Sequence, residues 1–282
     1  MKDLDSLSYF LGLEVSPTSN GYSLTQAKYA SDLLTPAGLT DCKIADSPLE
    51  PNIKLRPTDR ELLPDTTRYR QLVESLIYFT ITRPDIAYAV HLVSQFMSTP
   101  RSIHYAALLR ILRYAKGTLF HELHFSSHSF LTLQVYSDVD WARDPFDHRS
   151  TTGFLFLLGD SLISWRSKKQ TVVARSSTKA KYRALGDTTS ELLWLHWLLQ
   201  DMGVPQPSGT PLYCDNHSVV QITHNDVFHE HTKHIEIDFH FVHHHFQEGT
   251  LRFLSIPSAD QLADIFAKAH PPSHHRALVC KL

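Results

Sequence analysis

The second half of the sequence changes from helical spacing to a fixed succession of strand and helix patterns, which limits the possible folds more than any other feature. Apolar runs that begin at Leu131, at residues 153–158 and at residues 162–165, separated by short turns, predict three consecutive strands. A long helix follows, with Ser177 as its N-cap and an apolar face that continues to Gly203.

Five further elements are predicted after this helix. They are a strand at residues 211–214, a short helix at 218–223, a helix at 235–247, a strand at 251–256 and a last helix at 259–267. Some of these strands are joined by tight turns and others by helices. This succession is typical of one mixed sheet with helices on its faces. The sequence therefore predicts an α/β fold with a mixed five-stranded sheet.

The first part of the chain predicts a mostly α-helical region. Two strands within residues 7–15 and 21–24 are joined by an Asn20-Gly21 turn, and helical spacing follows in residues 26–39. Residues 43–65 contain prolines, show no periodicity and are expected to form a linker. A helix pair at residues 69–97 and a further helix at residues 104–115 follow it. The helix pair is expected to break at Pro84, because proline lacks the amide hydrogen of a helix interior.

Composition excludes several classes of protein. With 42% hydrophobic residues in 282, the chain is long enough for two folded domains, and no apolar run approaches the roughly 18 residues of a membrane span. The N-terminal residues resemble neither a signal peptide nor a transit peptide, so we expect an intracellular protein that is not secreted. The three cysteines, Cys42, Cys214 and Cys280, are far apart and predict neither a disulfide framework nor a zinc cage.

Three aspartates occupy positions that could form one site. Asp138 ends the first predicted strand of the sheet, Asp215 ends the fourth, and Asp264 lies on the last helix. Carboxylate oxygens are the ligands that Mg²⁺ prefers, and two such ions roughly 3.5–4 Å apart can hold the attacking water and the leaving oxygen of a phosphodiester. From the pattern alone, however, three ordinary surface or helix-capping aspartates are the simpler interpretation.

Short strings in a fixed order add a specific resemblance. In the second half they lie at residues 136–141, 149–153, 164–170, 175–178, 214–216, 232–235 and 263–266. Together they closely resemble the ribonuclease H domain of copia-type retrotransposon polyproteins. Strings at residues 9–12, 76–78, 82–86 and 112–114 resemble the part of the reverse transcriptase that follows its catalytic palm motif.

The resemblance implies two domains with different histories. Residues 1–127 would be a truncated reverse transcriptase, comprising the end of the palm and a thumb or connection remnant, and residues 128–282 a ribonuclease H-like domain. The Tyr-x-Asp-Asp strand that carries the polymerase metal ligands of the family would precede Met1, so polymerase activity is not expected.

The resemblance also implies a two-Mg²⁺ site at Asp138, Asp215 and Asp264, and it exposes one departure from the family pattern. After Ser-Ser-Thr the family has Glu-Ala-Glu-Tyr, whose second glutamate is the fourth acid, whereas this chain has Lys179-Ala180-Lys181-Tyr182. Lys181 thus places an ammonium where a carboxylate should touch the metals. Asp187 lies roughly 240° around the helix and Glu191 about 15 Å along it, so neither is expected to replace that acid.

Basic and polar side chains provide candidate contacts to nucleic acid. The net charge is −2, so binding would depend on local patches, and charge runs are usually ordinary solvated surface. With the resemblance, these side chains become expected phosphate and ribose contacts to an RNA–DNA hybrid. They are Lys168, Lys169, Arg175, Asn216, Thr232, Lys233 and His234.

The 19 histidines suggest a zinc site only weakly. His240 and His244 have helical ligand spacing, but there is no His-Glu-x-x-His motif and no cysteine at zinc spacing. Where the family has arginine, this chain has His231 and His243. Loss of arginine explains these two histidines better than metal binding does.

The resemblance leaves three functional alternatives. The protein could bind RNA–DNA hybrid with hydrolysis impaired by Lys181, cleave hybrid as an active Mg²⁺-dependent ribonuclease, or be a relic without a role. We favour the first, a pseudoenzyme in a cytoplasmic particle or the nucleus. The rest of a Pol polyprotein would be a further partner.

One genetic prediction follows from five departures from the family pattern. Lysine for glutamate at positions 179 and 181, histidine for arginine at 231 and 243, and Arg143 for glycine can each arise by one G-to-A transition. We therefore expect the underlying gene to differ from intact copies by that transition at all five codons, as in a copy that decays by cytosine deamination. Sequencing the gene tests this, and codons that require transversions or double changes would contradict it.

Overall fold

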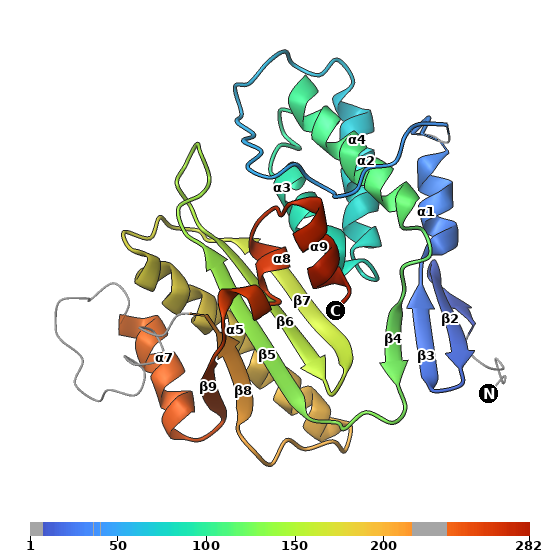
Figure 1. The fold of residues 1–282 in the computed structure, drawn as a ribbon. Helices are drawn as coiled ribbons and strands as arrows, with labels where there is room; N and C mark the ends of the chain where they lie inside the picture. Colours follow the sequence, from blue (N-terminus) through green and yellow to red (C-terminus); the bar gives the residue numbers. More distant parts are fainter. Residues whose placement is uncertain (1–7, 36, 40, 216–235) are drawn as a thin grey trace. The chain divides into compact units, whose positions relative to one another are not determined.

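The computed structural model describes residues 8–35, 37–39, 41–215 and 236–282. The chain divides into two compact units, Met1–His128 together with Ala269–Leu282, and Ser129–Lys268 (Figure 1). This division differs from two consecutive domains at residues 1–127 and 128–282, because the C-terminal segment belongs to the first unit. Among the described helices, none is long and apolar enough to cross a membrane.

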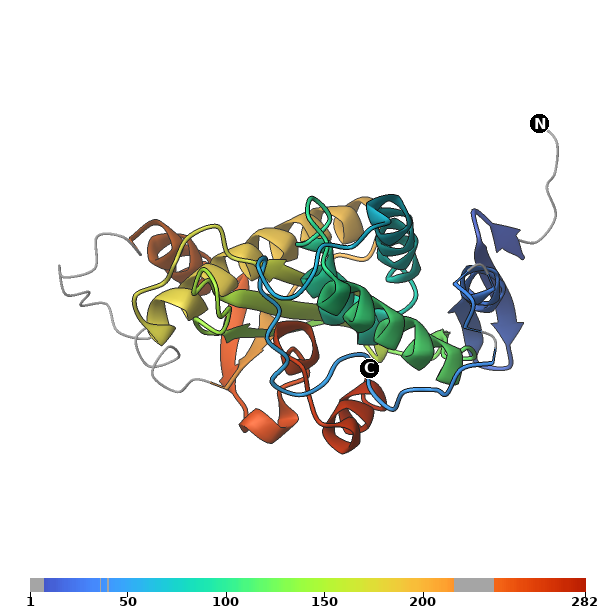
Figure 2. The same ribbon diagram turned by 90° about the horizontal axis from the view of Figure 1, so that it is seen from above.

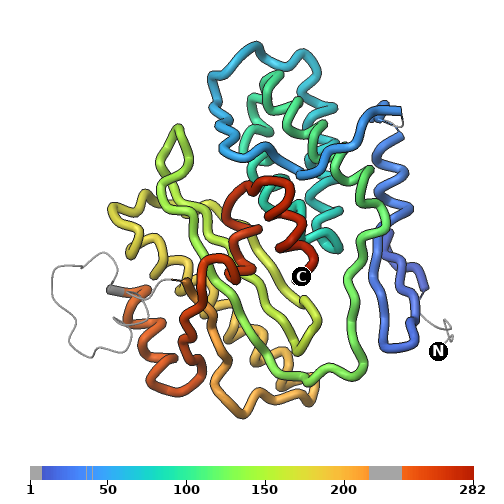
Figure 3. Tube along the Cα trace, viewed as in Figure 1, coloured from blue at the N-terminus to red at the C-terminus, as the bar shows by residue number. Residues whose placement is uncertain are grey.

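A mixed five-stranded sheet forms the centre of the second unit, which confirms the predicted fold class. Its strand order is β7-β6-β5-β8-β9. The strands are β5 (Leu133–Asp140), β6 (Thr151–Leu158), β7 (Ser161–Lys169), β8 (Thr210–Cys214) and β9 (Leu251–Ser255). β5, β6 and β7 form an antiparallel meander, whereas β8 runs parallel to both β5 and β9, and the path of the chain can be followed in Figure 3.

Helices cover both faces of this sheet. α5 (Ser177–Asp201) connects β7 to β8 and packs with α7 (Glu236–Gln247), while the short α8 (Asp264–Ala267) lies on the opposite face from α5 (Figure 2). The apolar run of β6 is buried on both faces, as expected for a strand inside a three-layer arrangement. α5 begins one residue earlier than predicted. Its N-cap is Ser176 and not Ser177, because the Ser176 hydroxyl accepts a hydrogen bond from the Lys179 amide at 3.2 Å.

The helix predicted at residues 259–267 forms only over its last four residues, as α8. A 3-10 turn at Ser258–Asp260 (η3) precedes α8, and Gln261 between them is extended. Gln261 is fully buried and donates a hydrogen bond from Nε2 to the Ser137 carbonyl of β5 at 3.1 Å. This bond draws the chain onto the sheet and interrupts the helix. The short helix predicted at residues 218–223 lies outside the described residues.

The first unit combines an antiparallel sheet of order β1-β2-β3-β4 with helices. Its strands are β1 (Tyr9–Phe10), β2 (Leu13–Thr18), β3 (Gly21–Thr25) and β4 (Leu123–Ser126). Its helices are α1 (Ala27–Leu34), α2 (Thr66–Phe79), the 3-10 turn η1 (Pro84–Ile86), α3 (Ala87–Ser94), α4 (Ser102–Gly117) and α9 (Pro272–Val279). β4 and α9 were not predicted, and the chain breaks between α2 and α3 at the expected proline.

A buried ion pair stabilises the helical part of the first unit. The Arg83 guanidinium contacts both carboxylate oxygens of Asp85, Nε to Oδ1 at 2.9 Å and Nη2 to Oδ2 at 2.6 Å, with both side chains almost fully buried. The Tyr114 hydroxyl donates to the same carboxylate at 2.8 Å, and His275 of α9 contacts the Asp85 carbonyl oxygen at 3.2 Å. This network connects η1, α4 and α9.

The environment of Asp85 links the stability of the first unit to pH. Burial alone would raise the pKa of Asp85, but the charge of Arg83 and hydrogen bonds from His121, Arg83 and Tyr114 hold it well below its usual range. A carboxyl group whose pKa is lower in the folded than in the unfolded protein stabilises the fold above the unfolded pKa of about 4. That stabilisation is lost as the pH falls further.

We predict that Asp85→Ala lowers the free energy of unfolding by about 3–5 kcal/mol, because it leaves the Arg83 charge buried without its partner. Urea unfolding at neutral pH measures this loss, and the difference from the unsubstituted protein should shrink as the pH is lowered below about 4. Asp32→Ala on the exposed face of α1 is the control and should change stability little. An equally small effect of Asp85→Ala would contradict the prediction.

Candidate active site

Two parallel strands place carboxylates at the same edge of the sheet. β5 and β8 pair through Val135 with Leu212 and Tyr136 with Tyr213. Continued by two residues, this register sets Asp138, near the end of β5, beside Asp215, directly after β8. The Asp138 side chain is only 5% exposed and that of Asp215 16% exposed.

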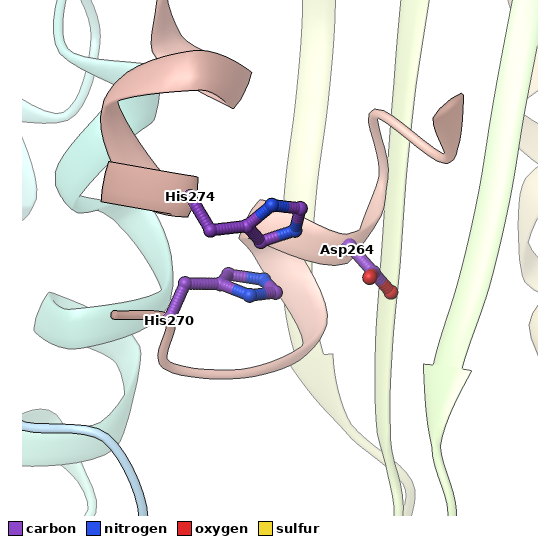
Figure 4. Close-up of side chains that lie close together, drawn as sticks. All are labelled: Asp264, His270 and His274. Carbon is purple, nitrogen blue, oxygen red and sulfur yellow. The ribbon is translucent and has the colours of Figure 1, made fainter. Parts of the chain in front are cut away.

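α8 brings the third aspartate to this edge because a glycine lets it approach the sheet. Gly153 of β6 pairs directly with Asp138 of β5. A Cβ atom at Gly153 would lie 2.7 Å from the Ala263 carbonyl oxygen and 2.9 Å from the Ala267 amide nitrogen, closer than side chains come to backbone. α8 therefore packs on the β6 backbone, and Asp264 (Figure 4) lies close enough to Asp138 to raise the pKa of that carboxyl.

α5 brings Lys181 to the same carboxylates. Small side chains let this helix lie close to β5, where Ala180 and Ala184 pack with Val139. The buried Gln170 fixes the first turn, donating to the Ala180 carbonyl at 2.8 Å and to the Thr152 hydroxyl at 3.1 Å. The sequence-predicted residues Asp138, Asp215, Asp264 and Lys181 are thus brought together, while their catalytic and metal-binding roles stay predictions.

Lys181 lies between two of the three aspartates. Its ammonium is 2.5 Å from Asp215 Oδ1 and 3.7 Å from Asp138 Oδ1, and its side chain is 14% exposed. Asp215 also accepts a hydrogen bond from the Ser258 hydroxyl at 3.1 Å. The ammonium bridges the ends of β5 and β8.

The electrostatics of the cluster follow from burial and from these contacts. Burial raises the pKa of Asp138, and its hydrogen bond to Asp264 and the charges of Asp264 and Asp215 raise it further against the opposing effect of Lys181. Burial would also raise the pKa of Asp215, but its hydrogen bond to Lys181 and the charge of that ammonium lower it below its usual value. Asp138 is therefore suited to holding a proton, and Asp215 to staying ionised.

Two further basic residues lie near the carboxylate cluster, of which Lys268 was not predicted from the sequence. Lys268 Nζ lies 2.8 Å from Asp264 Oδ1, one helical turn away, and Arg143 Nη1 lies 3.3 Å from Asp140 Oδ2. The four-residue spacing of Asp264 and Lys268 was visible in the sequence and could have identified Lys268. Arg143 thus pairs with the last residue of β5, the strand that carries Asp138.

The arrangement does not fit the two Mg²⁺ ions implied by the resemblance. Mg²⁺ binds carboxylate oxygens at about 2.0–2.1 Å. An ion on Asp215 Oδ1 would thus lie no more than roughly 4.6 Å from the Lys181 ammonium, where the repulsion is of order 7 kcal/mol at an effective dielectric constant of about 20. Asp187 and Glu191 do not substitute, since they contact Lys168 and Ser164, each at 3.0 Å.

The predicted nucleic-acid contacts on β7 are engaged in ion pairs. Lys168 contacts Asp187 at 3.0 Å, and Lys169 contacts Asp144 at 2.6 Å and Asp147 at 2.9 Å. The role of these two lysines as phosphate contacts stays a prediction, and binding there would have to compete with the neighbouring carboxylates. Arg175 is exposed. The remaining candidates, Asn216, Thr232, Lys233 and His234, lie outside the described residues.

The described histidine clusters make ring contacts. On α7, His243 stacks on Phe239, with ring centroids 5.4 Å apart and planes at 19°. In the first unit, the rings of His270 and His274 have centroids 4.7 Å apart (Figure 4). His231 lies outside the described residues.

Comparisons with known proteins place this arrangement in a family. No model of a protein family matches the chain. A retrovirus-related Pol polyprotein from transposon RE1 of Arabidopsis thaliana is 43% identical over 268 residues, which is 95% of this chain but only 18% of that polyprotein. The uncharacterized mitochondrial protein AtMg00810 of the same plant is 45% identical over 195 residues, or 69% of this chain and 80% of that protein.

Among solved structures, LC11-RNase H1 in complex with an RNA/DNA hybrid is 15% identical with a TM-score of 0.38, covering 48% of this chain and 94% of that one. The chain spans less than a fifth of the RE1 polyprotein, yet the match runs through both of its units. The resemblance found in the sequence is thereby confirmed. This chain belongs to the retrovirus-related Pol polyproteins of copia-type transposons.

Proposed function

We propose that the ribonuclease H-like second unit binds RNA–DNA hybrid and hydrolyses it negligibly. The observation that carries this proposal is the position of Lys181, whose ammonium bridges the Asp138 and Asp215 carboxylates. Membership of the Pol polyprotein family and the clustering of three aspartates at one sheet edge support a site inherited from a hybrid nuclease. The ammonium supports the loss of its hydrolytic step.

The proposed impairment rests on charge. Asp138, Asp215 and Asp264 with Lys181 carry a formal charge of −2, whereas a glutamate at position 181 would make it −4. A site of −2 is too weak to hold two divalent ions beside a phosphodiester that adds one negative charge. The described residues can attract and position a phosphate through Lys181 and Lys268, while the carboxylate of Asp215, which would otherwise be available to activate water, is paired with the Lys181 ammonium.

We further propose that residues 1–127 derive from the reverse transcriptase part of the polyprotein and serve here as a folded scaffold. The alternative function is an active Mg²⁺-dependent hybrid ribonuclease, which would require Lys181 to turn away and a divalent ion to replace it. The part of a Pol polyprotein outside this chain is the second proposed partner.

The first functional prediction is that the purified protein cleaves RNA–DNA hybrid negligibly in Mg²⁺, and that Lys181→Glu restores measurable cleavage. The substitution changes a repelling ammonium into a ligand, and each 1.4 kcal/mol regained is about tenfold in rate. A gel assay on hybrid with a labelled RNA strand measures this.

Lys179→Glu is the matched control, because it makes the same charge reversal two residues earlier, at the capped end of α5. It should restore nothing. Cleavage by the unsubstituted protein at rates typical of active ribonucleases H would refute the proposed impairment, and equal rescue by both variants would refute the specific role of Lys181.

The second functional prediction concerns hybrid affinity. Lys168→Ala combined with Lys169→Ala should weaken binding and flatten its dependence on salt by up to about 0.9 logarithmic units of slope for each lost phosphate contact. Fluorescence anisotropy at several salt concentrations measures this, with Arg252→Ala on the exposed face of β9 as a control. An unchanged slope would mean that the two lysines serve only their carboxylate partners.

A further inference from the structure

We infer that Lys181 is a built-in cation that takes the place of a divalent metal ion between Asp138 and Asp215. The second unit would then complete this carboxylate site without Mg²⁺, and the affinity for RNA–DNA hybrid would not depend on Mg²⁺. The part that concerns hybrid rests on the proposed function, whereas the part that concerns the metal rests on the geometry of the site alone.

The contacts of the ammonium support this role. A bridging cation must reach carboxylates that two different strands position. Lys181 Nζ lies 2.5 Å from Oδ1 of Asp215, directly after β8, and 3.7 Å from Oδ1 of Asp138 on β5. An ammonium carries three donors and suits several oxygen acceptors at once. Lys181 therefore neutralises the carboxylates that a bridging metal ion would have to share.

The position of Lys181 is fixed by its helix. The first turn of α5 is capped by Ser176, and its Ala180 carbonyl is held by the buried Gln170. The lysine side chain is only 14% exposed. Turning it outward would leave the buried Asp138 and the half-buried Asp215 side by side without this cation, which low-dielectric surroundings penalise.

The charge balance around the site leaves little to attract a metal ion. In the described structure, four carboxylates at this edge, Asp138, Asp140, Asp215 and Asp264, make ion pairs with three cations, Lys181, Lys268 and Arg143. One net negative charge remains by formal count. Such a site also repels an incoming phosphodiester less than uncompensated carboxylates would.

Lys268 offers a matched comparison. It pairs with Asp264 of the same cluster, but it lies directly after the short helix α8 that begins with Asp264, and its side chain is 32% exposed. It can therefore turn to solvent when another cation arrives, whereas Lys181 is enclosed between two strands. Only Lys181 should exclude a divalent ion.

Metal titration of the full chain tests the inference directly. We expect Mg²⁺ and Mn²⁺ at constant ionic strength to leave the unfolding temperature of the unsubstituted protein unchanged and to give no binding heat in calorimetry. A ligand that binds only the folded state must raise that temperature. Metal-induced stabilisation of the unsubstituted protein would overturn the inference without any variant.

Variants then locate the effect. Lys181→Glu should unfold at a lower temperature in EDTA and regain stability on addition of Mg²⁺, with measurable heat. Lys181→Met should lose stability in EDTA because it removes the bridging charge and keeps the length of the side chain. Lys268→Met should behave like the unsubstituted protein toward metal. A response of Lys268→Met equal to that of Lys181→Glu would contradict the assignment to Lys181.

Hybrid binding completes the experiment. The unsubstituted protein should bind hybrid equally in EDTA and in Mg²⁺, while Lys181→Glu should bind at least about tenfold more weakly in EDTA, since four carboxylates then face the phosphate. Affinity of the unsubstituted protein that requires Mg²⁺ would refute the built-in cation. Absence of hybrid binding in every condition would refute the proposed function, while the metal titrations would still decide the role of Lys181.

Discussion

The second unit depends on the balance of charge at one edge of its sheet. Parallel pairing of β5 with β8 and the close approach of α8 force three carboxylates together, a placement that is stable only when cations lie among them. In this chain the cations are the protein's own side chains, with Lys181 in the central position. The same geometry that would concentrate negative charge for metal binding thus holds an ion-pair network.

Much of this arrangement was predictable because its determinants are local. The uninterrupted apolar run of β6, the periodic face of α5 and the acids at strand ends are each visible in a few consecutive residues. What was missed depends on distant partners. The four residues of β4 become a strand only by pairing with β3, about a hundred residues earlier in the chain, and the helix expected at 259–267 is broken by a single bond from Gln261 to β5.

The roles of charged residues were harder to predict from the sequence than the positions of buried apolar residues. Consecutive lysines on β7 resemble a free basic patch in the sequence, but Asp144 and Asp147 contact Lys169, and Asp187 contacts Lys168. Ion pairs of this kind form between residues far apart in the chain and have no periodic signature. Family strings therefore identify the acids of the site, whereas the ion pairs that those acids make are identified by the fold.

The return of the C-terminal segment to the first unit has a consequence for synthesis on the ribosome. α9 supplies His275 to the network of Arg83 and Asp85, yet it is translated after the whole of the second unit. The second unit can therefore finish folding while the first still lacks one of its helices. During that interval the buried ion pair is incomplete, and the earliest part of the chain to be made is the last to reach its full stability.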